Sequence, residues 1–478
     1  MKQISLFYIV TLVVVSAAIM GLLHLGSSLP MPQDTTAGPI APNEHESALS
    51  GLMEGLRANF DHPLSHLFVQ LLVIITASRV VGKIFIRLGQ PGVVGEMAAG
   101  ILLGPSLFGL LAPAAFAFVF PANSLAALRL LSQIGVCLFM FAVGMELDVR
   151  HVRSKAQAAV VVSHASIVFP YLLGVLLAYF LFTDLAGPGA TFTAFALFMG
   201  ISMSITAFPV LARILQERGM PKTFLGSTAI TCAAVDDVTA WSILAFVVAI
   251  AKATSIGGSA LNLLLVMMFI AIMTFGVRPL LPRCLGSDRL AREEPSKETL
   301  ATVMCVVVAA ALSTELIGIH ALFGAFLAGT IMPATAGFRR KINVRVENFS
   351  SVLLLPLFFA FTGLRTQIGL LDDWQGWLLC FLIIAVATLG KLGGSAVAAR
   401  LTKLSWSESL QLGALMNTRG LMELIALNIG YDMGILSPRI FAMLVIMALT
   451  TTMMTGPLLT LFGNKETVEN ALRESSRA

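Results

Sequence analysis

The sequence predicts an all-α protein that crosses a lipid bilayer many times. Hydrophobic residues make up 57% of its 478 residues, whereas charged residues make up only 12%, about half of what a soluble domain carries. The apolar runs are long and continuous rather than alternating, which favours helices over a barrel. These observations exclude a soluble enzyme, a disordered protein and a fibrous repeat. No basic face that would bind nucleic acid is present, and no cofactor is expected.

Each predicted span is an apolar run of about the 20 residues that a helix needs to cross the hydrocarbon core. The first run belongs to residues 1–27, which are either a retained N-terminal helix or a signal peptide. A domain of thirteen helices follows over residues 63–463. The spans are expected near residues 4–25, 63–87, 92–112, 124–146, 156–182, 190–213, 222–251, 260–281, 298–317, 319–335, 347–365, 375–400, 406–431 and 438–463.

The Lys and Arg residues predict the orientation in a cell membrane. Most of the 31 fall between spans on one side, which the positive-inside rule assigns to the cytoplasm. A short tail, residues 464–478, lies on the same side, and residues 28–62 become an external segment with five acidic residues. The cytoplasmic clusters lie within residues 79–87, 150–155, 213–222, 278–297, 339–345, 400–403 and 465–477.

Two strings recur in the same order in the two halves of the chain. Residues 98–105 read AAGILLGP and residues 325–333 read AFLAGTIMP; residues 138–148 read LFMFAVGMELD and residues 357–365 read LFFAFTGLR. With six spans in each half, this pattern predicts two inverted-topology six-helix repeats of the kind found in secondary transporters. The alternative is a chance resemblance between glycine-rich apolar strings.

The inverted-repeat arrangement predicts a broken helix at the same place in each half. The span 190–213 contains Thr206 shortly before Pro209, and proline removes a backbone hydrogen bond and clashes with the preceding turn. The span 406–431 is interrupted by the polar residues of MNTRGLMEL, residues 416–424. We therefore expect two crossed, unwound helices whose free carbonyls and helix ends can hold an ion. Helix–helix contacts through Ser and Thr are the alternative explanation.

Two adjacent carboxylates lie deep in the span 222–251. Asp237 is 15 residues from both Lys222 and Lys252, about 22 Å along a helix. An aspartate at the bilayer centre costs at least roughly 2.5–3.5 kcal/mol. Adjacent helical residues point about 100° apart, so Asp236 can face a protein partner while Asp237 faces a water-filled cavity.

The candidate counter-charge for Asp236 is Lys391, nine residues from Arg400 and therefore about 13 Å from that end of its helix. An ion pair between the two is either structural or part of proton coupling. Arg419 and Glu423 are four residues apart and are expected to neutralise each other, with a structural or regulatory role. Glu96 has no assigned partner and is expected to contact the backbone or an arginine.

Five strings in the chain carry a family resemblance. They are GEMAAGILLGPSLFG at 95–109, SITAFPVLARIL at 204–215, AAVDDVTAW at 233–241, GIHALFGAFLAG at 318–329 and GKLGG at 390–394. In combination they resemble the monovalent cation:proton antiporter family. The resemblance covers about residues 63–463 and points to the second branch, with the plant cation/proton exchangers, Kef-type potassium proteins and bacterial sodium/proton antiporters.

The resemblance implies a homodimer in which a mobile six-helix core moves like an elevator past a fixed domain. It implies that Asp237 binds the cation and the proton, that Asp236 pairs with Lys391, and that Thr206 helps to line the Na⁺ or K⁺ site. Asp-Asp members resemble electrogenic exchangers. Kef proteins usually carry Gln-Asp and a C-terminal nucleotide-sensing domain, so no nucleotide-binding domain is expected here.

The expected mechanism is competition between a proton and a cation at Asp237. Burial favours the neutral form of a carboxyl group, whereas a bound cation favours the anion, so one site carries one or the other. The rival interpretation is a gated cation channel that conducts without proton coupling, but no filter of the TVGYG kind is present. An intramembrane enzyme is not expected, because neither GxSxG nor HExxH occurs.

Overall fold

The structure is a computed structural model. It describes residues 62–146, 156–220, 223–252, 256–286, 295–334 and 337–463, together with a few isolated positions before residue 62. The chain divides into two units, Met1–Phe60 and Asp61–Ala478, and the fold below is that of the second. The predictions for residues 1–27, 28–62 and 464–478 lie outside the described residues, apart from those isolated positions and residue 62.

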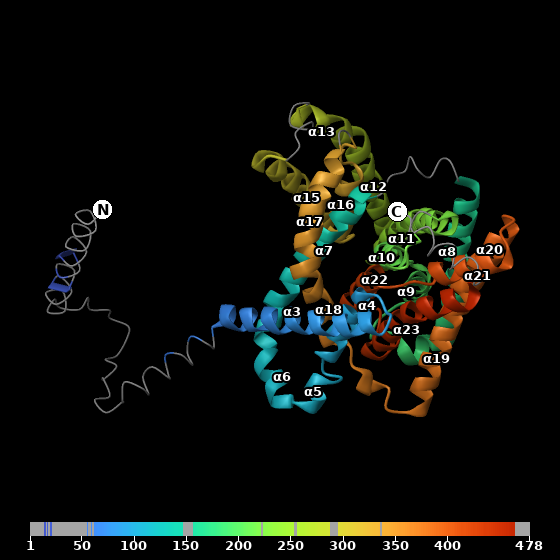
Figure 1. Cartoon of the computed structure of the whole chain (residues 1–478), viewed down its shortest axis with the longest axis horizontal. Helices are drawn as coiled ribbons and strands as arrows, with labels where there is room; N and C mark the ends of the chain where they lie inside the picture. The colour runs from blue at the N-terminus through green and yellow to red at the C-terminus, as the bar shows by residue number, and fades with distance from the viewer. Residues whose placement is uncertain are drawn as a thin grey trace. The chain divides into compact units, whose positions relative to one another are not determined.

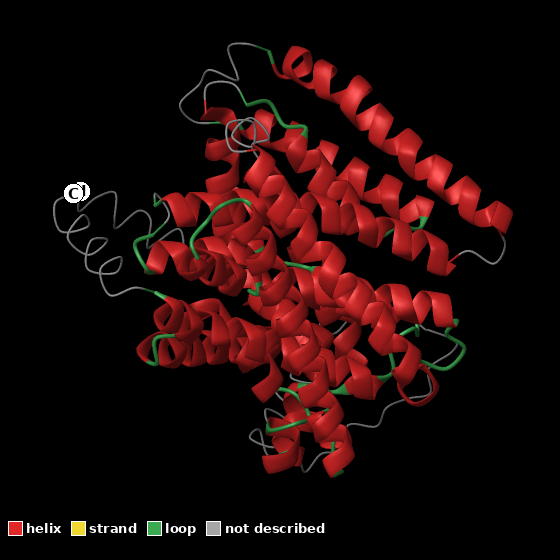
Figure 2. Cartoon of the chain, turned by 90° about the vertical axis from the view of Figure 1, so that its right-hand side faces the viewer, coloured by secondary structure: helices red, strands yellow, loops and turns green. Residues whose placement is uncertain are grey.

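The described part of the second unit is built from helices joined by loops, with one isolated bridge between Ala186 and Leu436 (Figure 2). Figure 1 shows the longer helices in chain order. They are α3 (Pro63–Arg87), α4 (Gly92–Leu102), α7 (Leu125–Glu146), α8 (Ala156–Leu185), α9 (Phe192–Ser204), α10 (Phe208–Glu217), α11 (Phe224–Lys252), α12 (Ile256–Ala271), α13 (Arg278–Leu285), α15 (Lys297–Ile317), α16 (Ala321–Thr330), α17 (Phe338–Phe349), α18 (Leu355–Arg365), α19 (Trp374–Thr388), α20 (Gly394–Leu401), α21 (Trp406–Met416), α22 (Leu421–Asp432) and α23 (Pro438–Phe462).

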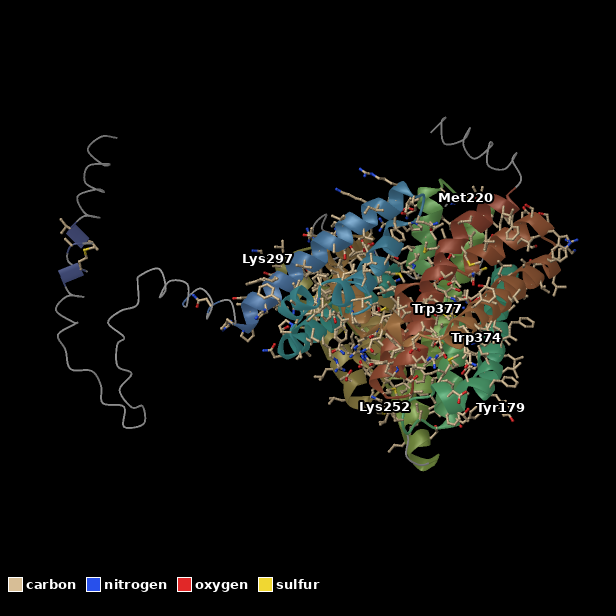
Figure 3. The ribbon with its side chains drawn as sticks, turned by 90° about the horizontal axis from the view of Figure 1, so that it is seen from below. Tyr179, Met220, Lys252, Lys297, Trp374 and Trp377 are labelled. Atoms are coloured by element: carbon tan, nitrogen blue, oxygen red, sulfur yellow. The ribbon has the colours of Figure 1, made fainter. Side chains whose placement is uncertain are left out.

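An all-helical polytopic membrane protein is therefore confirmed. Among the described residues, 10 helical segments are long and apolar enough to cross a membrane, and α4 and α16 are shorter apolar helices. The predicted span 406–431 is divided between α21 and α22, each too short to cross alone. Figure 3 shows Met220 and Lys252, which flank α11, at opposite ends of the helical unit, as expected for a crossing helix of 29 residues.

Two helices end earlier than predicted, for the same physical reason. The helix α4 stops at Leu102 rather than near residue 112, and α16 stops at Thr330 rather than near residue 335. Pro105 and Pro333 follow these ends, and the residue before a proline is disfavoured in the helical conformation. The two similar strings thus end their helices in the same way. A further difference is that the span predicted at 347–365 begins earlier, with α17.

The glycines of the repeated strings allow helices from opposite halves to pack closely. A methyl group on Gly363 of α18 would collide with the Gly100 carbonyl of α4. In the same way, a methyl group on Gly329 of α16 would collide with the Phe141 carbonyl of α7. The first string of each half therefore packs against the second string of the other half, and only glycine permits such close backbone approach.

We predict that Gly363→Ala destabilises the protein by about 1–3 kcal/mol or more, because overpacking a close backbone contact forces helices apart. Gly369→Ala is the matched control, since a methyl group there meets no atom within 4 Å. The melting temperature in detergent micelles measures both. Equal melting of the wild type and Gly363→Ala would show that the crossing of α4 and α18 is not close in solution.

Candidate functional site

Two broken helices meet at their breaks. Between α9 and α10 the chain is extended over residues 205–207, and between α21 and α22 it leaves the helix over residues 417–420. The Ala207 amide of the first break donates to the Thr418 carbonyl of the second at 3.0 Å. Pro209, near the start of α10, explains why the first helix does not run through.

Buried cations satisfy the free carbonyls at the end of α9. The Arg419 guanidinium donates to the carbonyls of Ser202 and Met203, both at 2.7 Å. The Lys391 ammonium donates to the carbonyl of Ser204. The last carbonyls of a helix have no intrahelical partner and carry partial negative charge, so both cations are placed where a helix end stabilises them.

Asp236, on α11, is fully buried and saturated with donors. Its carboxylate accepts from Ser163 at 2.6 Å, from Ser166 at 2.7 Å and from Thr206 at 2.6 Å. The Lys391 ammonium lies 3.2 Å away. Three hydroxyl donors and one ammonium group therefore surround this carboxylate.

Lys391 lies in a π-helical stretch, Leu389–Gly393, between α19 and α20. Besides Asp236 and Ser204, its ammonium donates to the Ser166 carbonyl at 3.0 Å. An ammonium group has three N–H donors, and the three acceptors belong to three different residues. Single-turn π stretches are frequent at functional sites, and this one presents a fully buried lysine.

Asp237 is the opposite of its neighbour. It is also fully buried, yet neither carboxylate oxygen has a hydrogen-bond partner among the described residues. The Phe208 amide at the start of α10 lies nearby but does not form a hydrogen bond to either oxygen. An unpartnered buried carboxylate is costly as an anion. A proton or a bound cation would relieve that cost.

The remaining candidate charged residues, Arg419, Glu423 and Glu96, form two separate ion pairs. Arg419 and Glu423 pair at 3.3 Å with both side chains buried, although Arg419 also reaches the end of α9, as described above. Glu96 of α4 takes part in a different pair, in which its carboxylate is 3.6 Å from Arg79 of α3. Glu96 is thus assigned an arginine rather than the backbone.

Two groups of residues were not found from the sequence. The first is the pair of serines Ser163 and Ser166 on α8. The sequence feature that points to them is two hydroxyl residues three positions apart in an apolar run. The second is Asp432 at the end of α22, which pairs with Arg365 at 2.7 Å and with Arg129 at 3.3 Å. The sequence feature that points to Asp432 is Arg129, a charged residue within the apolar span predicted at 124–146, which needs an acidic partner.

Comparisons with known proteins identify relatives. A family model described as "Sodium/hydrogen exchanger, transmembrane" matches residues 72–465. The chain is 43% identical over 393 residues to the Na(+)/H(+) antiporter NhaS4 of Synechocystis, covering 82% of this chain and 96% of that protein. It is 31% identical over 425 residues to the K(+)/H(+) antiporter 1 of Saccharomyces cerevisiae, covering 86% of this chain and 48% of that protein, so it spans about half the length of the yeast relative.

Among solved structures, the sodium proton antiporter MjNhaP1 of Methanocaldococcus jannaschii has a similar fold. The TM-score is 0.59 at 14% sequence identity, and the match covers 86% of this chain and 99% of that one. At this identity the likeness establishes the fold alone.

We predict that Lys391→Met lowers the free energy of unfolding by about 3–5 kcal/mol, because it leaves the buried Asp236 carboxylate without its counter-charge. Adding Asp236→Asn should restore much of that loss, since the pair is then removed as a unit. Lys297→Met, at the exposed start of α15, is the control. Unfolding is followed in detergent for the wild type, Lys391→Met, Asp236→Asn, the double variant and the control. Additive effects of the two substitutions would contradict the energetic coupling.

Proposed function

The chain belongs to the sodium/hydrogen exchanger family of transmembrane monovalent cation/proton antiporters, and on this basis we propose that it exchanges K⁺ or Na⁺ for protons by competition at Asp237. Membership makes it a transporter and not an enzyme. The observation that carries the proposal is the contrast between the two buried aspartates. Asp236 is saturated with donors, whereas Asp237 has no hydrogen-bond partner in the described part of the chain.

The chemistry of exchange follows from this contrast. A proton neutralises Asp237 by binding to the carboxylate, and a monovalent cation neutralises it by pairing with the ionised form. The two cannot occupy the carboxylate at the same time. If only the neutralised carboxyl group crosses the membrane barrier, every cation moved one way permits a proton to move the other way. Asp236 then remains the partner of Lys391, and a cation that competes for Asp236 would weaken that pair and promote proton loss from Lys391.

Alternating access is supported by two cavities near opposite ends of α11. One, of about 770 Å³, is lined by Lys252, His320 and Asp432 among others. The other, of about 400 Å³, is lined by residues that include Gln90 and Arg218. Asp237 lines neither of these cavities and is fully buried. Exchange therefore needs conformations that open Asp237 to each end in turn.

An elevator-like movement of one six-helix core against a fixed domain is the form of alternating access we propose. This movement presupposes two inverted-topology repeats. The packing of α4 on α18 and of α16 on α7, each between the two halves of the chain, supports such repeats. Asp432 of α22 is bound to Arg129 of α7 and Arg365 of α18, so these ion pairs must rearrange if α22 moves relative to the other two. The homodimer and the cytoplasmic C-terminus stay predictions.

Asp237→Asn is expected to reduce exchange at least about 100-fold, because an amide cannot trade a proton for a cation. The measurement is cation-driven pH change in proteoliposomes that hold a pH dye. Asp184→Asn, an exposed position at the end of α8, is the control and should keep the wild-type rate. A wild-type rate for Asp237→Asn would refute the proposal.

Competition also predicts a pH dependence with a definite sign. In the range where Asp237 is mostly protonated, the apparent KM for the cation should fall about tenfold for each unit by which pH rises on the cation-loading side, while the maximal rate changes much less. Initial rates at several cation concentrations and pH values test this. A KM that is independent of pH across the active range would show that cation and proton use different groups.

A further inference from the structure

An apolar cavity of about 580 Å³ is lined by residues of α11, α12, α13 and α16, but not by Asp236 or Asp237 themselves. Figure 1 shows where these helices lie in the fold. The inner wall of the cavity is aromatic. Trp241 of α11 packs edge-on against Phe323 and stacks with Phe326, at ring-centre distances of 5.3 Å and 6.1 Å. Phe269 of α12 adds a fourth buried ring. Side chains of this kind suit a hydrocarbon chain rather than an ion.

Water is a poor occupant of this cavity. A buried water needs two to four polar partners, and the hydroxyl groups on two of the walls are already used. Ser242 donates to the Val238 carbonyl at 2.7 Å, and Thr330 donates to the Leu327 carbonyl at 2.8 Å. Arg339 is folded back on the carbonyls of Thr330 and Met332.

The cavity lining also includes a basic and a hydroxyl side chain without partners among the described residues. Arg278, the first residue of α13, is exposed and forms no hydrogen bond or ion pair with any residue of the described ranges. Thr274, four residues earlier in the π-helical stretch Ile272–Val277, also lines the cavity and has no hydrogen-bond partner there. A cation and a hydroxyl one turn apart form a recognition pair for an anionic oxygen group.

The position of this pair in the bilayer fits the same ligand. The distribution of Lys and Arg assigns Arg278 to the cytoplasmic side, where anionic lipids attract basic side chains. Three apolar side chains of α12 and of the π-helical stretch that follows it are each about half exposed: Met267, Met268 and Ile272. A lipid chain can therefore reach the cavity from the membrane.

We propose that this cavity binds one anionic phospholipid, with an acyl chain against the aromatic wall and the phosphate at Arg278 and Thr274. The bound lipid would contact Val238 and Trp241, which follow Asp237 on α11. The site lies beyond the proposed exchange chemistry, and its occupancy can be measured without any transport assay.

The test uses the full chain, purified in a mild detergent and titrated with phosphatidylglycerol or with phosphatidylcholine of the same acyl chains. Native mass spectrometry counts the lipids that stay bound. We expect one phosphatidylglycerol to bind tightly, with phosphatidylcholine weaker. Arg278→Gln should weaken phosphatidylglycerol roughly fivefold, as expected for the loss of one basic residue near a lipid surface.

Three variants make the result specific. Arg283→Gln removes the same charge from an exposed position of α13 outside the cavity lining and should bind like the wild type. Arg278→Lys keeps the charge and should retain most of the affinity. Ala245→Phe, inside the cavity, should abolish tight binding; its melting temperature without lipid shows whether it folds.

Two results would overturn the proposal. Equal binding of both lipids, or equal loss in Arg278→Gln and Arg283→Gln, would show that the anionic headgroup is not recognised at Arg278. Unchanged binding in a folded Ala245→Phe would show that the lipid lies on the outer surface and not in the cavity.

Discussion

The site depends on one electrostatic arrangement, the end of α9 held by two buried cations. A helix that stops in the middle of a membrane leaves carbonyls that no water can satisfy, and each such group costs several kcal/mol. Arg419, in the break between α21 and α22, and Lys391, in the π-helical stretch, meet that demand, and Asp236 balances the charge of Lys391. The broken helix, the buried lysine and the first aspartate are therefore parts of one structure, and none of them is stable in this place alone.

This arrangement explains why two adjacent aspartates can have different roles. Asp236 is held by donors from three places: Ser163 and Ser166 of α8, Thr206 in the break after α9, and Lys391 in the π-helical stretch. Asp237, turned about 100° away on the same helix, has no hydrogen-bond partner among the described residues. In the proposed exchange, the energetic cost of burying this carboxylate favours binding of a hydrogen ion or a metal cation.

Much of this architecture could be predicted from the sequence, because its signals are local. Apolar runs of bilayer length locate the spans, Pro209 locates the first break, and the distance of Asp237 from Lys222 and Lys252 reveals its depth. The pairing of Asp236 with Lys391 could be predicted, but its serine donors could not, since Ser163 and Ser166 reach it only through the rotation of α8 against α11, which no local pattern records. The same holds for Asp432, whose arginines come from helices distant in the sequence.

The glycine crossings have a consequence for how the protein is made. Helix α4 packs against α18, and α16 packs against α7, so each half of the chain supplies what the other half needs. While the ribosome is still producing the second half, the first half waits in the bilayer with its glycine faces covered only by lipid. The two crossings can therefore form only after α16 and α18 have been synthesised, and a chain that stops before them would leave the glycine faces of α4 and α7 without their helical partners.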